Sequence, residues 1–204
     1  MRLSYLMQID MHSLPYPFAH MLPDNWRWMA EAGVDGYVME FTPNEWGTFG
    51  QSAHAIGRLS WDTDMDLDAW LAEHDEHVFG PAAAEIGELR DRLTHDLALP
   101  GPCTGHYDLS YTARATDELM RPALEALGRA RALAATGEKR HWRAVQKTWV
   151  GIELLMRMGR WQRLVRDGLE VRASQAAAET LEWARGQADS GALAIGRIER
   201  ALGR

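Results

Sequence analysis

The chain has 204 residues, of which 46% are hydrophobic and 25% are charged. These values predict one ordinary globular domain, or a small domain with an appendage. A single cysteine, Cys103, excludes an internal disulfide framework, and no stretch approaches the roughly 18 apolar residues of a membrane helix.

The net charge of −7 is unevenly divided along the chain. Residues 1–111 hold 5 Lys+Arg and 18 Asp+Glu, giving −13, whereas residues 112–204 hold 17 and 11, giving +6. In the basic half Arg alternates with Glu, which is typical of solvated helix faces and disfavours nucleic acid as a partner. No signal peptide is visible, because acidic residues, histidines and prolines interrupt the first twenty residues, so we expect a cytoplasmic protein with no membrane partner.

Two apolar runs near the N-terminus are each associated with a carboxylate, which lies at or near the C-terminal end of the run. Residues 3–9 predict a short buried strand that ends at Asp10, and residues 34–41 predict a second strand that carries Glu40. A helix from Asn25 to Ala32 separates them. Since strand, helix and strand form a right-handed crossover, we expect parallel strands with both carboxylates at one edge of a sheet.

From residue 51 onward the pattern is helical. Apolar residues recur at intervals of three and four within segments that are bounded by capping residues, glycine or proline. The expected helices cover residues 53–61, 64–78, 81–97, 117–135, 142–158, 171–187 and 192–202. Two parallel strands do not form a stable sheet alone, so the chain is a fragment of a longer enzyme, shares its sheet with a partner, or uses the strands to cover the helices.

Two segments carry a resemblance to a known family. AGVDGYVMEF and the following GRLSWDTDMDLDAWLAEHDEHVFGPAAAEI resemble the C-terminal part of the domain of unknown function 4838 family, whose members look like glycoside hydrolases related to the family 67 α-glucuronidases. The matching residues are Arg58, Leu59, Trp61, Asp62, Asp66, Leu71, Phe79, Gly80, Pro81 and Ala82.

The resemblance implies a fold class and a domain division. It implies a mainly α protein in which two N-terminal parallel strands are the end of a TIM-like barrel, followed by an all-helical domain of about six helices. Residues 1–50 would be the terminal strands and loops of a partial barrel, and residues 51–204 the helical domain. The early barrel strands have no counterpart in this sequence, so a partner chain or a missing barrel segment would complete the barrel.

The carboxylates are the candidate catalytic residues. By position Asp10 and Glu40 resemble the pair that activates water in the α-glucuronidases, although structural roles for both remain open. His12, His20 and Trp46 are candidates for substrate binding, since imidazoles donate to sugar hydroxyls or a uronate and an indole stacks on a sugar ring. The absence of HExxH, paired CxxC, EF-hand and phosphate-loop patterns predicts no metal and no cofactor.

Two functions are consistent with these observations. The first is the C-terminal portion of a glycoside-hydrolase-like protein that acts on an oligosaccharide or a uronate-containing glycan, with a further acid supplied from outside this sequence. Whether the isolated chain is active is left open. The alternative is a non-catalytic helical interaction module that binds a partner chain.

Overall fold

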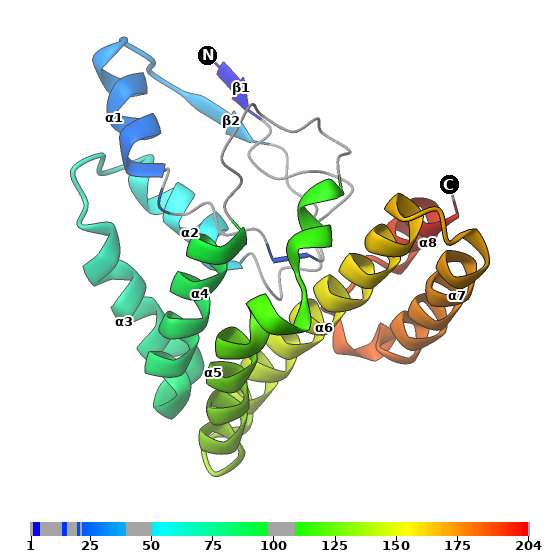
Figure 1. The fold of residues 1–204 in the computed structure, drawn as a ribbon. Coiled ribbons are helices and arrows are strands. Elements are labelled where there is room, and N and C mark those ends of the chain that lie inside the picture. The colour runs from blue at the N-terminus through cyan, green and yellow to red at the C-terminus, as the bar shows by residue number, and fades with distance from the viewer. Residues whose placement is uncertain are drawn as a thin grey trace.

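The computed structural model describes residues 2–4, 14–15, 20, 22–39, 50–97 and 109–203, with the side chains of residues 2–4 and 37–39 excepted. Most of the described residues are helical (Figure 1). The α-helices are α1 (Leu22–Glu31), α2 (Gly50–Leu59), α3 (Leu67–Phe79), α4 (Ala83–Leu97), α5 (Asp117–Ala135), α6 (Lys139–Arg166), α7 (Glu170–Gly186) and α8 (Ile195–Leu202). Short 3-10 helices are η3 (Gly80–Ala82), η4 (Ser110–Arg114) and η5 (Ala188–Ser190).

The predicted fold class, with two barrel strands leading into a helical domain, is wrong for the described residues, which form a helical protein. Within them, extended backbone is limited to the three-residue segments β1 (Arg2–Ser4) and β2 (Tyr37–Met39), which lie parallel with Leu3 opposite Val38. Val34, expected to begin the second strand, packs instead against helices α1 to α3. The strand therefore begins at Tyr37 and not at Val34, because local sequence does not show whether an apolar residue belongs to a buried strand or packs on helices.

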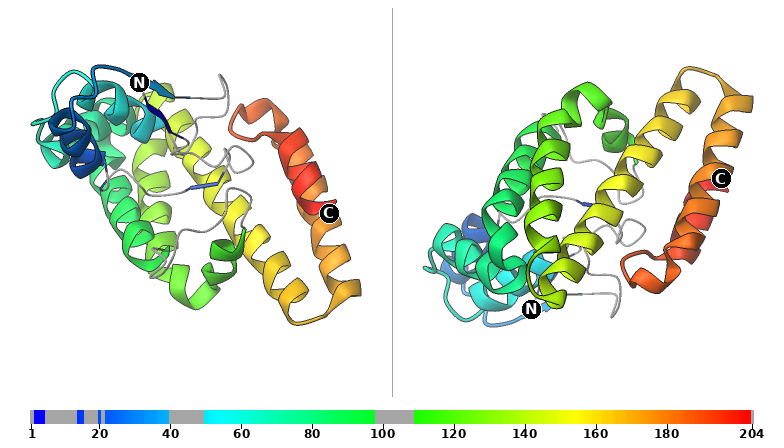
Figure 2. Two further views of the ribbon diagram at one scale, coloured as in Figure 1. Left: turned by 90° about the horizontal axis from the view of Figure 1, so that it is seen from above. Right: turned by 90° about the horizontal axis from the view of Figure 1, so that it is seen from below.

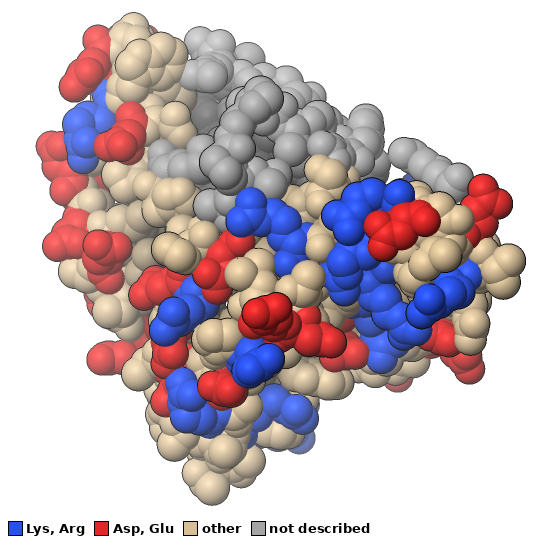
Figure 3. Space-filling view, viewed as in Figure 1, with Lys and Arg blue, Asp and Glu red and all other residues tan. Residues whose placement is uncertain are grey.

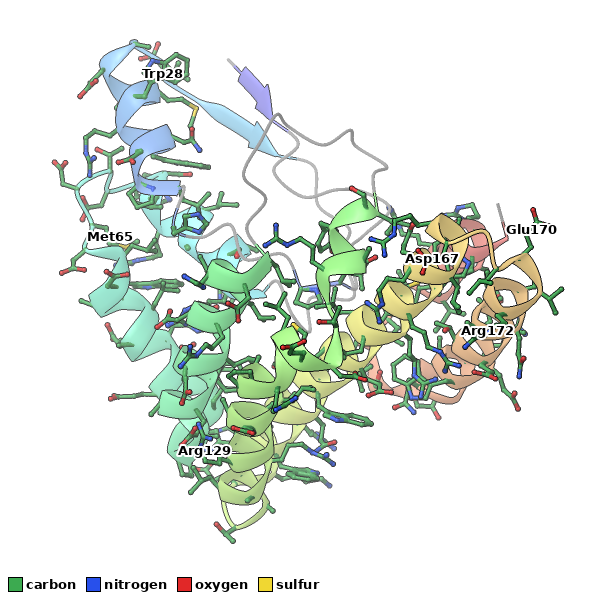
Figure 4. All side chains as sticks on the ribbon, viewed as in Figure 1. Trp28, Met65, Arg129, Asp167, Glu170 and Arg172 are labelled. Carbon is green, nitrogen blue, oxygen red and sulfur yellow. The ribbon has the colours of Figure 1, made fainter. Side chains whose placement is uncertain are left out.

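Helices α1, α2 and α3 form one hydrophobic cluster. Leu22, Trp26 and Met29 of α1 are spaced i, i+4 and i+7, so that one face of the helix is buried against the other two helices. The indole Nε1 of Trp26 also donates a 3.1 Å hydrogen bond to Ser60 Oγ after α2. Met65, in the connection to α3, packs against the same cluster (Figure 4).

A second and larger cluster joins α4 to α8. The 28-residue helix α6 lies between α5 on one side and α7 on the other, as the two views of Figure 2 show. Arg129 of α5 binds Glu85 and Glu88 of α4 at 2.8 and 2.6 Å, beside the α4–α5 contact (Figure 4). Several tryptophans of α6 and α7 are half-buried against the cluster, and the Arg157 guanidinium lies 4.8 Å from the centroid of the Trp183 ring.

Two glycines permit close approaches that a side chain would prevent. Gly80 has φ +54° and ψ −123°, and its Cα lies against the ring of His141, the buried third residue of α6. Gly159 faces the backbone carbonyls of Thr112 and Ala115, and Arg163 one turn later donates to Ala113 O and Ala115 O at 3.1 and 2.8 Å. The absence of a side chain at Gly159 therefore permits η4 to pack closely against α6, and the helix continues past this residue to Arg166.

Charge is distributed as the sequence predicts. Asp and Glu gather over the face formed by α1 to α3, whereas Lys and Arg gather over α6 and α7 (Figure 3). Among the described residues, none of the helices is both long enough and apolar enough to cross a membrane. The division of the chain at residue 50 stays a prediction.

Candidate functional site

Most of the predicted site residues lie outside the described part of the chain. Asp10, His12, Glu40 and Trp46 belong to this group, so their grouping into one site stays a prediction. His20 is described, and its side chain is exposed two residues before the start of α1.

The described residues contain a buried polar cluster centred on Asp75 of α3. The residue is 2% exposed, and its carboxylate receives three hydrogen-bonding groups from three helices. Gln51 of α2 donates Nε2 to Oδ1 at 2.6 Å, and Arg90 of α4 donates NH1 to Oδ2 at 2.5 Å. The neighbouring His74 places Nδ1 3.2 Å from Oδ1. The carboxylate thus links α2, α3 and α4 at one point.

The local sequence explains why Asp75 is buried. Asp66 caps α3 by accepting the backbone N–H of Ala69 at 3.0 Å, which fixes where the helix begins. The residues buried on α3 then recur every four positions, and they are Leu67, Leu71, Asp75 and Phe79. Asp75 therefore occupies a core position of an apolar stripe, where an ionised carboxylate needs partners.

This cluster was not predicted. A helix was expected over residues 64–78, and Asp75 was not among the predicted site residues, although it extends the stripe of Leu67 and Leu71 by four residues. The signal available in the sequence was a carboxylate at a core position with no basic residue on the same helix face. Its cation, Arg90, lies 15 residues further along on a different helix.

Aromatic rings cover the cluster on the side of α2. The ring centroids of His54 and His74 are 5.5 Å apart with the planes inclined at 67°, and the Trp70 ring lies 5.2 Å from His74. Partial burial lowers the pKa of His54 below its ordinary value of 6.5, and the positive charge that His74 carries when protonated lowers it further. Both effects favour the neutral form of the His54 imidazole.

The chemistry of this cluster is that of an oriented histidine. Arg90 neutralises Asp75, and Asp75 in turn interacts with Nδ1 of His74. The second polar atom of the His74 ring is Nε2. Within the described ranges, no group of three or more His, Cys, Asp or Glu residues is arranged to hold a metal ion. The cluster joins helices and orients one imidazole.

The part of the chain that contains most of this cluster is similar to a known family. Residues 2–88 match the family model of a domain of unknown function, DUF4838. This segment is similar to that family, and it covers less than half of the 204 residues. No curated protein and no solved structure matches the chain.

The DUF4838 match includes all five predicted site residues, Asp10, His12, His20, Glu40 and Trp46. It also includes α1, α2, α3 and the first residues of α4, and thus Gln51, His54, His74 and Asp75. Arg90 lies two residues beyond the match. Helices α5 to α8 follow the DUF4838 segment and complete the second hydrophobic cluster.

Proposed function

We propose that this chain is part of a glycoside-hydrolase-like, carbohydrate-active protein in which Asp10 and Glu40 supply catalytic carboxylates. The observation that supports the proposal is the DUF4838 match over residues 2–88, which includes both acids. The relation to the family 67 α-glucuronidases rests on the resemblance of the sequence alone. His12, His20 and Trp46 surround the acids in sequence and would contact the sugar.

The chemistry requires two carboxyl functions on opposite sides of the glycosidic bond. One protonates the leaving oxygen, and the other acts as a base toward water or as a nucleophile. Two carboxylates held near each other raise the pKa of one of them, which suits a base that works near neutral pH. Asp10 and Glu40 would supply the base side, and a further acid from outside this sequence would protonate the leaving group.

The helices have a supporting role in this proposal. Helix α1 lies between Asp10 and Glu40 in the sequence, and its buried residues Leu22, Trp26 and Met29 attach it to α2 and α3. Helix α1 is thereby fixed to a packed scaffold. The proposal requires such rigid elements, because reacting groups held on them lose little freedom when a substrate binds.

The test compares Glu40→Gln and Asp10→Asn with Glu45→Gln, a matched change of a nearby acid, in the full-length protein. Release of reducing ends from oligosaccharides and of nitrophenol from a panel of aryl glycosides is measured, with urea unfolding as a folding control. We expect hydrolysis to fall at least 100-fold in the first two variants and to persist in Glu45→Gln, with stability unchanged. Wild-type turnover in Glu40→Gln would refute the catalytic assignment.

A second function is supported by exposed apolar side chains. Trp61, in the turn between α2 and α3, is 94% exposed, and Val171 at the start of α7 is 84% exposed. Single exposed apolar side chains are common on folded proteins, so Trp61 marks an interaction surface only if its removal abolishes association. If the wild-type chain hydrolyses none of the glycosides and shows concentration-dependent association in sedimentation velocity that Trp61→Ser abolishes, the interaction module is the better description.

A further inference from the structure

The first half of helix α6 carries a row of cations that have no counter-ion. Residues 139–152 hold four Lys and Arg residues and no Asp or Glu. Three of these cations, Lys139, Arg143 and Lys147, are exposed and follow one another at intervals of four, so they lie in one row along the helix, about 6 Å apart. Within the described part of the chain, none of the three forms an ion pair with a carboxylate. We call these residues the cationic row.

The cationic row is unfavourable for the helix itself. Like charges four residues apart repel each other, and a cation at the start of a helix opposes the positive end of the helix dipole. Lys139 is the first residue of α6, whose first turn contains no acidic residue, and the N-cap Glu138 is paired with Arg140 at 2.9 Å. Natural proteins break such local rules mainly at functional sites, and an anion bound along the row would remove both unfavourable effects.

Two tryptophans lie beside the cationic row. Trp142 and Trp149 are half-buried against the hydrophobic core and are seven residues apart, which places them on one face of α6 about two turns from each other. The guanidinium of Arg131 on α5 lies 4.8 Å from the centroid of the Trp149 ring. This contact places the tryptophan face next to α5 and brings a fourth cation to it. The surface therefore combines cations with partly exposed indole rings.

We propose that this surface binds an acidic polysaccharide, a uronate polymer whose carboxylates contact the cationic row and whose sugar rings contact Trp142 and Trp149. Charge complementarity selects an anionic ligand, and the apolar faces of sugar rings suit partly exposed indoles. A single-stranded nucleic acid fits less well, because its bases stack on open aromatic faces, whereas the Arg131 guanidinium already lies over the Trp149 ring.

The surface is separate from the proposed catalytic site. It lies on α6, beyond the DUF4838 match over residues 2–88, and none of its residues is among the predicted site residues. The choice of a glycan rests on the proposed carbohydrate-active function, whereas the negative charge of the ligand rests on the cationic row. The two proposals fail separately, because binding at α6 requires no hydrolysis and should persist in Glu40→Gln.

The experiment is titration of the purified chain, without a histidine tag, with polygalacturonate by isothermal calorimetry at pH 7 and 50 mM NaCl. Fully methyl-esterified polygalacturonate tests the charge, and a dT oligonucleotide and phosphatidylserine vesicles test other polyanions. The decisive variant is Arg143→Gln/Lys147→Gln, which removes two exposed cations of the row. The matched control is Arg121→Gln/Arg172→Gln, which removes two exposed cations from α5 and α7.

We expect polygalacturonate to bind with a submillimolar Kd, at least tenfold more tightly than the methyl ester, the oligonucleotide or the vesicles, and more weakly at 300 mM NaCl because salt screens the charges. Arg143→Gln/Lys147→Gln should weaken binding at least tenfold while its urea midpoint stays equal or rises, since like-charge repulsion is removed. The control variant and Glu40→Gln should bind as the wild type does.

Several results would overturn the proposal. These are the absence of polygalacturonate binding, equal binding by Arg143→Gln/Lys147→Gln and the wild type, or binding of the methyl ester, the oligonucleotide or the vesicles that is as tight as that of polygalacturonate. Binding of polygalacturonate by a chain that hydrolyses no glycoside would leave this proposal standing and count against the catalytic one.

Discussion

Substitution of Gly80 by alanine should destabilise the protein severely. Gly80 ends α3 and begins η3, with a positive φ that L side chains rarely adopt. A Cβ at this position would overlap Nδ1 and Cε1 of His141, whose ring is 6% exposed and cannot move outward without repacking α6. The change therefore combines backbone strain with steric overlap.

The magnitude follows from these two parts. A non-glycine residue in a sparsely populated backbone region costs about 1–3 kcal/mol. Forcing a methyl group into a packed site costs about 1–3 kcal/mol more. We therefore expect Gly80→Ala to lower the free energy of unfolding by about 2–6 kcal/mol, a large part of the 5–15 kcal/mol typical of a folded domain.

The assay is urea unfolding monitored by tryptophan fluorescence, with a control that separates the two parts. Gly168 also has a positive φ, +69°, one residue after the C-terminal cap of α6, but a Cβ there would have no atom within 4 Å. Gly168→Ala should therefore show only the backbone cost, about 1–2 kcal/mol. In a His141→Ala background the overlap is removed, so Gly80→Ala should cost less than in the wild type. If Gly80→Ala is no more destabilising than Gly168→Ala, the steric argument is refuted.

Three further predictions concern the buried cluster and α6. Asp75→Asn should lower the free energy of unfolding by about 3–5 kcal/mol in the same urea assay, because it leaves Arg90 without its buried counter-ion. Asp91→Asn, at an exposed position, should change the free energy of unfolding by less than about 0.5 kcal/mol. Gly159→Ala should be destabilising, because its Cβ would overlap the Thr112 carbonyl oxygen. Gly128→Ala on α5, with open space around it, should be neutral or stabilising by up to about 1 kcal/mol. Equal effects of the two changes on the free energy of unfolding would contradict the contact between Gly159 and Thr112. The imidazole of His54 should titrate by NMR with a midpoint below 6.5, because burial and His74 disfavour its protonation. Its contribution to the free energy of unfolding is then complete above pH 6.5 and decreases as the pH falls below that value. A midpoint at or above 6.5 would contradict this prediction.

Much of the helical structure follows from local sequence. Residues 117–135 were predicted as a helix and form α5 over the same range, with Thr116 capping it through the N–H of Leu119. The Gly80 and Pro81 pair was predicted to separate two helices, and it does so as η3 between α3 and α4. Spacing of apolar residues and capping groups are properties of a few neighbouring residues, so the sequence alone specifies them.

The predicted boundaries of helices and strands were wrong where packing depends on residues that are distant in the sequence. Val34 was expected to begin a strand, yet β2 begins at Tyr37 and Val34 packs on the cluster formed by α1, α2 and α3. The helix expected over residues 142–158 ends before Gly159, but η4 packs against this glycine and α6 continues to Arg166. In both cases the deciding partner lies tens of residues away in the chain.

The sequence by itself determined most of the helices and the uneven division of charge, and it carried the DUF4838 resemblance that the match over residues 2–88 supports. Only the tertiary structure decided that Asp75 is buried, that Arg90 and Gln51 are its partners, and that His54 and His74 meet between two helices. The reason is physical: helix formation and capping depend on residues within one or two turns, whereas the pairing of a buried charge depends on how separate helices pack. Composition and spacing therefore identify the helices, and the packed structure identifies which polar groups they bring together.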